Sequence, residues 1–159
     1  MSTEQNKAIV RRFVTETLSG RNVALADELL APNYLNRMTG ADLAAFKGML
    51  AGMRSALSDA RFEVDELVAE GDAVVARWTM EATHTGSLMG ESPTGKDISS
   101  RGLTYYRLEE DQIVEDDPVS TPDLLQALGI QMPAQPGRKA YPDLTAAFDA
   151  AQATARLVR

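Results

Sequence analysis

Hydrophobic positions in the first third of the chain recur with the period of an α-helix. Over residues 4–19 they fall on one helical face, at Ile9, Val10, Phe13, Val14 and Leu18. Asn22 is placed to cap a second short helix, which Pro32 ends. A third helix starts at Asp42, closes near residues 58–59, and carries an apolar stripe at Leu43, Phe46, Leu50, Met53 and Leu57.

After residue 60 the hydrophobic period changes from that of a helix to two, the period of a strand. Residues 61–69 and 73–85 are predicted strands joined by a tight turn at Glu70-Gly71-Asp72, and a third strand covers residues 98–108. One face of the 73–85 strand carries Val74, Ala76, Trp78, Met80, Ala82 and His84. One face of the third strand carries Ile98, Ser100, Gly102, Thr104, Tyr106 and Leu108. Helices followed by antiparallel hairpins predict an α+β domain in which helices cover one face of a curved sheet.

The stretch from Ile113 to Gly129 combines a strand, an acidic run and a Leu-rich helix. After the Glu110-Asp111 turn, Ile113-Val114 begins a strand that runs into three carboxylates and Pro118. Strict alternation places Glu115 and Asp117 on the face of Ile113, and Val114 and Asp116 on the other. At least one carboxylate is therefore a candidate to point into an apolar interior.

Residues 133–159 differ in composition from the preceding 1–132 domain. Prolines and a glycine mark a linker, and a last amphipathic helix begins at Pro142. Its narrow apolar stripe is a candidate for docking on the domain or on a second subunit. The stripe consists of Leu144, Phe148, Ala151, Ala155 and Val158.

Composition narrows the possible functions. The 159 residues are 44% hydrophobic and 25% charged, typical of one ordinary globular domain. A formal net charge of −7 without a Lys/Arg run argues against nucleic acid as a partner. With no cysteine, a single histidine and no phosphate-binding loop, we expect no metal site and no cofactor. Without a signal-peptide pattern or a membrane-length apolar run, we expect a cytoplasmic location and no membrane partner.

Several short runs, taken in order, resemble one family. They are Tyr34-Leu35-Asn36, His84-Thr85-Gly86, Leu88-Met89-Gly90, Pro93-Thr94-Gly95-Lys96, Tyr106-Arg107-Leu108, Ile113-Val114-Glu115 and Leu124-Leu125-Gln126-Ala127-Leu128-Gly129. Their joint order over roughly residues 4–132 resembles the SnoaL-like polyketide cyclases. The resemblance implies the cone-shaped α+β fold of ketosteroid isomerase and nuclear transport factor 2, and a homodimer or higher homo-oligomer.

The resemblance also implies cofactor-independent aldol closure of the last ring of an aromatic polyketide ester. In such cyclases one aspartate near the end of the strand acts as acid and base. Because this chain is one residue shorter there, Asp117 is the best match and Asp116 the alternative. His84 matches the strand-end histidine of the family, and Tyr34 and Asn36 match its pocket-mouth segment.

Chemistry assigns the remaining candidates. Glu115 would tune the pKa of the catalytic aspartate, because a neighbouring carboxylate raises it. His84, Thr104 and Tyr34 would hold or polarise substrate carbonyls, with His84 also a catalytic candidate. Trp78 and Met80 would form a wall for a small hydrophobic polyketide-like substrate.

Structural readings of the same residues are also open. The carboxylates equally suit a solvated strand end, and Trp78 and Met80 suit simple core packing. Thr104 stands where known cyclases carry histidine, and the family's tryptophan after Ile113 is missing. A hydroxylation component, an epoxide-handling enzyme on the same fold and a non-catalytic binding protein are therefore the alternatives to a cyclase.

Overall fold

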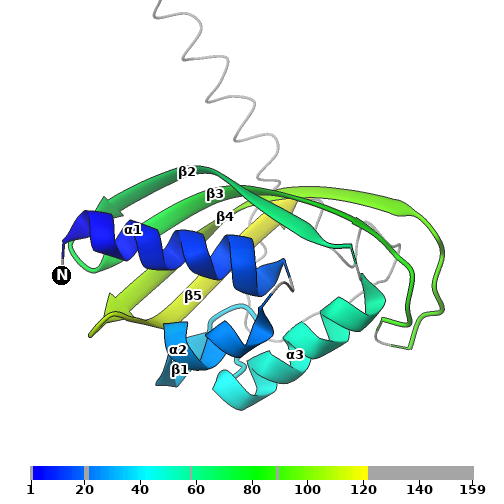
Figure 1. The fold of residues 1–159 in the computed structure, drawn as a ribbon, viewed down its shortest axis with the longest axis horizontal. Helices are drawn as coiled ribbons and strands as arrows, with labels where there is room; N and C mark the ends of the chain where they lie inside the picture. Colours follow the sequence, from blue (N-terminus) through cyan, green and yellow to red (C-terminus); the bar gives the residue numbers. More distant parts are fainter. Residues whose placement is uncertain (1, 20–21, 58, 89, 122–159) are drawn as a thin grey trace, which may run out of the picture.

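The computed structural model describes residues 2–19, 22–57, 59–88 and 90–121 (Figure 1). Its elements in chain order are α1 (Thr3–Arg12), the π-helical segment η1 (Phe13–Leu18), the 3₁₀ turn η2 (Val23–Leu25), α2 (Ala26–Leu29), β1 (Leu30–Asn36), α3 (Leu43–Ala56), β2 (Arg61–Glu70), β3 (Ala73–Thr83), β4 (Asp97–Glu109) and β5 (Gln112–Thr121). The predicted Leu-rich helix, the linker and the C-terminal helix lie outside the described residues. None of the described helices has the length and apolar character needed to cross a membrane.

Five strands form one sheet in the order β1-β5-β4-β3-β2. Strands β2 to β5 pair antiparallel with their neighbours in sequence, as predicted. At one edge, outside the predicted hairpins, β1 pairs parallel with β5. Residues 33–36, for which the sequence pattern predicts neither helix nor strand, are part of β1. A parallel neighbour is possible here because α3 and three strands separate β1 from β5, and parallel pairing needs a long crossover.

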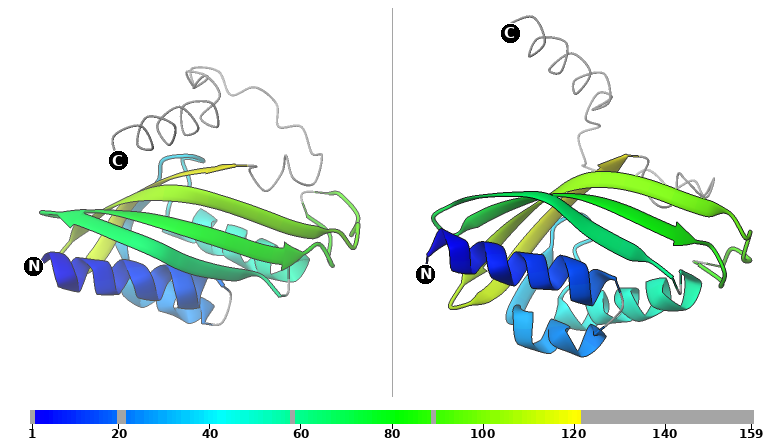
Figure 2. Two further views of the ribbon diagram at one scale, coloured as in Figure 1. Left: turned by 90° about the horizontal axis from the view of Figure 1, so that it is seen from above. Right: turned by 45° about the horizontal axis from the view of Figure 1, so that its top comes forward.

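The sheet is curved and open, and helices α1, α2 and α3 lie on the same side of it (Figures 1 and 2). We call the helix-covered face of the sheet the inner face and the opposite one the outer face. Alternation along β3 and β4 is as predicted, with the inner-face residues buried or half-buried. Phe13 joins the two layers, since its ring lies 6.2 Å from that of Phe46 on α3 and 6.0 Å from that of Tyr106 on β4. The α+β class and the helix-covered curved sheet are confirmed.

Helix α3 has specific partners at both ends. At its start the Asp42 side chain accepts a hydrogen bond of 2.9 Å from the amide of Ala45, which confirms Asp42 as the N-cap. At its end the carbonyl oxygen of Ala56 accepts from the amides of Thr85, at 2.9 Å, and Gly86, at 3.0 Å. The segment after β3 therefore caps α3 and fixes its distance from the sheet.

Close packing at this cap explains the glycine at position 86. A Cβ atom on Gly86 would lie 2.2 Å from the carbonyl oxygen of Ser55, which is backbone and has little freedom to move. We expect Gly86→Ala to lower the free energy of unfolding by about 1–3 kcal/mol through overpacking. Gly48→Ala is the matched control, because Gly48 lies in α3 with nothing within 4 Å of the added Cβ.

Urea denaturation of the two variants tests this. Gly48→Ala should raise the free energy of unfolding by about 0.5–1 kcal/mol, since alanine loses less backbone entropy in a helix. Equal effects of the two substitutions would contradict the role assigned to the cap.

Candidate functional site

A β-bulge near the start of β5 determines which carboxylate enters the interior. Leu108 of β4 pairs with Ile113, but its neighbour Arg107 pairs with Glu115, so Val114 is an extra residue in β5. Such an insertion shifts the alternation of all later residues by one. Ile113 and Val114 are consequently both buried, and from Glu115 onward the inward positions are the even-numbered ones.

The preference for Asp117 as the inward carboxylate is therefore a misplacement. Asp117 is exposed, whereas Asp116, the alternative, is 5% exposed. The error has one physical cause, because strict alternation from Ile113 ignores the bulge. Pro118 follows where β5 has passed its last pairing with β1, at Asp116. A strand edge is a position that tolerates proline.

Two side chains of β1 hold the Asp116 carboxylate. The Tyr34 hydroxyl donates to Oδ1 at 2.8 Å, and the Asn36 amide nitrogen donates to the same oxygen at 2.8 Å. All three residues are buried. Neither of these bonds uses Oδ2, so the two donors orient the carboxyl group through one oxygen.

The orientation of Asn36 is itself fixed by a turn. Its Oδ1 accepts hydrogen bonds from the Thr39 amide, at 2.8 Å, and from the Thr39 hydroxyl, at 2.7 Å. These donors require the amide oxygen to face the turn and the NH₂ group to face Asp116. Thr39 was not anticipated as part of the site, because its contribution depends on the turn that follows β1.

Burial is the main electrostatic influence on Asp116. Removal from water raises the pKa of Asp116 from 3.8 to about 7, and Asp117 and Glu115 contribute in the same direction. The hydrogen bonds from Tyr34 and Asn36 act against this rise in pKa, since they stabilise the charged form. A carboxyl group in this state exchanges its proton near neutral pH, which suits general acid-base catalysis.

Two tyrosines next to Asp116 remain protonated. Burial and the nearby Asp116 charge raise the pKa of Tyr34 well above its usual range. The same two causes raise the pKa of Tyr106, the residue paired with Asp116 across β4 and β5. The phenol groups of Tyr34 and Tyr106 are thus neutral neighbours of the Asp116 carboxyl group. Tyr106 was not among the predicted site residues, although it shares the inner face with Thr104 and alternation could have identified it.

Trp78 and Thr104 form the next part of the inner face. The indole Nε1 of Trp78 donates to the Thr104 hydroxyl at 2.9 Å. Gly102 allows this position, because a Cβ there would lie 2.5 Å from an indole carbon and 2.4 Å from the carbonyl oxygen of Val119. Both Trp78 and Thr104 are buried, and Met80 is buried farther along β3. Trp78 and Thr104 thus lie on the same inner face as Asp116, next to Tyr106 along β4.

His84 does not join this cluster. Asp116 is level with Tyr106 and Val74 across the sheet, and His84 is ten residues beyond Val74. At about 3.3 Å per residue this is roughly 33 Å of chain. Helix α3, which starts near Asn36 and ends beside the segment after His84, spans roughly 21 Å. The structure therefore places His84 at the other end of the inner face from Asp116, and a shared role of the two residues stays a prediction.

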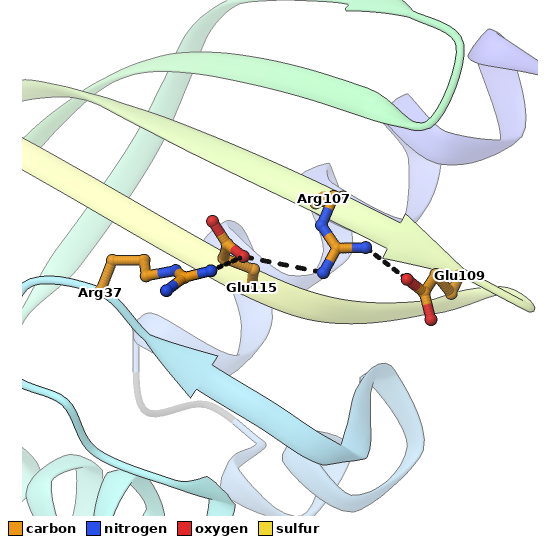
Figure 3. A network of polar contacts seen from close by, with 4 residues as sticks. All are labelled: Arg37, Arg107, Glu109 and Glu115. Atoms are coloured by element: carbon orange, nitrogen blue, oxygen red, sulfur yellow. Dashed lines mark hydrogen bonds and ion pairs between the residues drawn. The ribbon is translucent and has the colours of Figure 1, made fainter.

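Glu115 faces away from Asp116. Its carboxylate forms an ion pair of 2.7 Å with Arg37 and lies 3.7 Å from Arg107, which also pairs with Glu109 (Figure 3). The hydrogen bond from Arg37 is the main reason that the pKa of Glu115 lies below its usual range. Glu115 thus belongs to an ion-pair network on the outer face, and its charge contributes to the raised pKa of Asp116 from there.

Two cavities of the described part of the chain lie away from Asp116. An open groove of about 440 Å³ runs between α1, α2 and the β4–β5 turn. A space of about 20 Å³ lies between η1 and α3. Asp116 lines neither of these two cavities.

The pKa of Asp116 predicts an unusual pH dependence of stability. A carboxyl with a raised pKa binds its proton more tightly when folded, so the free energy of unfolding falls as the pH rises from about 4 to about 7. Asp116→Asn lacks this contribution. Its free energy of unfolding relative to the parent should therefore rise by up to about 4 kcal/mol between about pH 4 and about pH 8. Urea titrations of both proteins across this range measure the difference, and a fall in it would contradict the raised pKa.

The tight approach of Trp78 to Gly102 gives a spectroscopic prediction. Trp78 is the single tryptophan of the chain, so its fluorescence reports on this site alone. Gly102→Ala should displace the indole, break the bond to Thr104 and shift the emission maximum toward that of an exposed tryptophan. Gly52→Ala, where the added Cβ meets nothing within 4 Å, is the control. An unchanged emission spectrum of Gly102→Ala would refute the close packing.

Comparison with known proteins places this fold and site in context. The sequence matches the SnoaL-like polyketide cyclase family over residues 8–128. No protein of curated function matches the chain.

Several solved structures are similar to this chain in fold and sequence. AclR from Streptomyces galilaeus, a candidate hydroxylase, is 25% identical with a TM-score of 0.70, and the match covers 97% of this chain and 95% of AclR. A candidate polyketide cyclase from Acidithiobacillus ferrooxidans is 29% identical with a TM-score of 0.67, covering 81% of this chain and 96% of the other. IdmH from Streptomyces antibioticus is 23% identical with a TM-score of 0.67 and shares the fold. The match covers 79% of this chain and 99% of IdmH.

The family match extends over most of the chain and includes the described strands from β1 to β5. It also includes Asp116 and its two β1 partners. The chain belongs to the SnoaL-like polyketide cyclase family and has the nuclear transport factor 2-like fold of that family.

Proposed function

We propose that this protein is an acid-base enzyme that acts on a small polyketide-like molecule, most simply by intramolecular aldol ring closure. The observation that carries the proposal is the buried Asp116 carboxyl, held through Oδ1 by Tyr34 and Asn36. Its pKa of about 7 leaves both protonation states accessible near neutral pH. Membership of a polyketide cyclase family supports the substrate class.

In the proposed reaction Oδ2 of Asp116 removes a carbon-bound proton that lies between two carbonyl groups of the substrate. The resulting enolate carbon attacks a second carbonyl carbon of the same molecule and forms the new ring bond. The carbonyl oxygen becomes an alkoxide and takes up the proton, so the product is an isomer of the substrate. The enolate spreads over the conjugated rings, and the substrate itself thus supplies much of the stabilisation of the negative charge.

Neutral groups around Asp116 suit this chemistry. Tyr34 and Asn36 keep the carboxyl in one orientation during proton removal and proton return, which saves the entropy of aligning it. Trp78 offers an aromatic surface for flat rings, and the Thr104 hydroxyl is a donor or acceptor for a ring oxygen. In this proposal Asp116 moves the proton, while these four residues position it and the substrate.

A role in ring hydroxylation is the second candidate. The specific observation in its favour is the match to AclR, a candidate hydroxylase, which covers 97% of this chain, compared with 81% for the Acidithiobacillus protein. The two reactions differ in their requirements, since a hydroxylation adds oxygen and consumes a reductant, whereas aldol closure needs neither. An aromatic polyketide methyl ester with its last ring open, incubated without reductant, separates them by the mass of the product.

Replacement of Asp116 tests the proposed acid-base role. Asp116→Asn keeps an oxygen that can accept from Tyr34 and Asn36 but cannot take up the proton, so kcat for ring closure should fall by about 10²- to 10⁴-fold. In the parent protein kcat/KM should rise with pH through an apparent pKa near 7, because the carboxylate form removes the first proton. Stopped assays by liquid chromatography across this range measure both.

Asp117→Asn is the matched control, with the same chemical change one residue along on the exposed face. Its kcat should remain within a few-fold of the parent value. Loss of turnover in Asp117→Asn together with its retention in Asp116→Asn would assign the chemistry to the other aspartate.

A further inference from the structure

His84 lies at the far end of the inner face from Asp116 and has an unused hydrogen-bonding atom. It is the single histidine of the chain, and its side chain is fully buried. It continues the inward series of Trp78, Met80 and Ala82 along β3. The two residues that follow it bond the carbonyl oxygen of Ala56, so His84 sits where the strand meets the end of α3.

Thr94 determines the tautomer of His84. The Thr94 backbone amide donates to Nδ1 at 3.3 Å, and an amide N–H can only donate. The Thr94 hydroxyl lies 3.1 Å from the same nitrogen and accepts in turn from the Lys96 amide. Nδ1 must therefore be the unprotonated acceptor, and the ring proton lies on Nε2. Backbone bonds from His84 to Lys96 and from Gly95 to His84, both 2.9 Å, hold the loop in place.

Nε2 of His84 is buried and has no hydrogen-bond partner among the described residues. A buried N–H without an acceptor costs free energy, and such groups in native proteins call for a reason. The same end of the fold contains a second orphan, the Thr17 hydroxyl, which is fully buried and lines the space of about 20 Å³ between η1 and α3. Leu57, the residue after Ala56, also lines that space. This end of the fold therefore contains two buried polar groups, His84 Nε2 and the Thr17 hydroxyl, that have no hydrogen-bond partner among the described residues.

We propose that His84 Nε2–H is a donor subsite for a carbonyl oxygen of a polycyclic aromatic ligand, and that Thr94 is the positioning residue that fixes its tautomer. The ligand class rests on the proposed function. His84 binds and does not transfer protons here, because Nδ1 is occupied by donors and Nε2 already carries its hydrogen. The subsite lies roughly 21 Å from the Asp116 end, as judged by the length of α3.

Nitrogen-15 NMR of untagged protein tests the subsite on one resonance pair, since the chain has a single histidine. In the free protein we expect the Nε2–H form. Addition of 1,8-dihydroxyanthraquinone, a tricyclic aromatic ketone, should shift the Nε2–H resonance and leave Nδ1 unprotonated. A Nδ1–H form in the free protein, or no Nε2 shift at a saturating or highest soluble concentration of the probe, overturns the proposal.

Variants test the same subsite through affinity. The Kd of each variant for the same anthraquinone is measured by Trp78 fluorescence and compared with that of the parent protein. His84→Phe should weaken binding about five- to tenfold, the effect of one lost hydrogen bond. Thr94→Val should weaken it less, because it removes the hydroxyl but keeps the backbone amide on Nδ1, and Thr94→Ser should restore the parent affinity. Thr79→Val, on the same strand with its hydroxyl on Asp65, is the control. Unchanged affinity in His84→Phe overturns the subsite. If that variant does not fold, the NMR result on the wild-type protein is the deciding test.

The subsite and the proposed function fail separately. Loss of turnover in Asp116→Asn with an intact Nε2 shift supports both. Normal turnover in Asp116→Asn with an intact Nε2 shift removes the acid-base role and retains the subsite. An Nε2 signal that the probe leaves unchanged, in a protein that still closes rings, removes the subsite alone.

Discussion

The cost of burying a carboxyl group constrains the whole inner face. A charged Asp116 in the interior needs donors, and the sheet supplies them from β1, a strand that joins β5 in parallel at the edge. Parallel pairing sets Asn36 level with Asp116, so two side chains of one short strand converge on a single oxygen. Without that edge strand the carboxyl would face the helices unpaired.

Around this acid the interior is polar but carries little charge. Tyr106 is level with Asp116, and Trp78 and Thr104 bond each other one step farther along the sheet. The charged residues next in sequence, Glu115 and Asp117, lie on the outer face or in solvent, where Arg37 neutralises Glu115. The fold thus separates a proton-exchanging group from its ionic neighbours by the thickness of one sheet, and their charges act on it only weakly.

Local patterns in the sequence were sufficient for the class of fold and for the inward residues of β3 and β4, because strand alternation depends only on neighbouring residues. They placed Trp78 and Thr104 on the inner side, while Tyr34 and Asn36 were suggested by the family resemblance. They failed where pairing partners decide the geometry. The extra residue in β5 follows a turn at Glu110 and Asp111, both with positive φ. It can be recognised only from the pairing of β5 with β4. The separation of His84 from Asp116 depends on strand length and register, which the motifs of a single sequence do not contain.

Because Asp116 and Asp117 are adjacent and follow a bulge, β5 can keep an inward carboxyl group when its register changes. If Val114 paired with β4 as an ordinary ladder residue, β5 would return to simple alternation and the side chain of Asp117 would turn inward, whereas deletion of Val114 would keep Asp116 inward. In either case a carboxyl group would still face the interior. In such a doublet a register change moves the acid instead of removing it, so this segment is able to gain or lose a residue while keeping an inward carboxyl group.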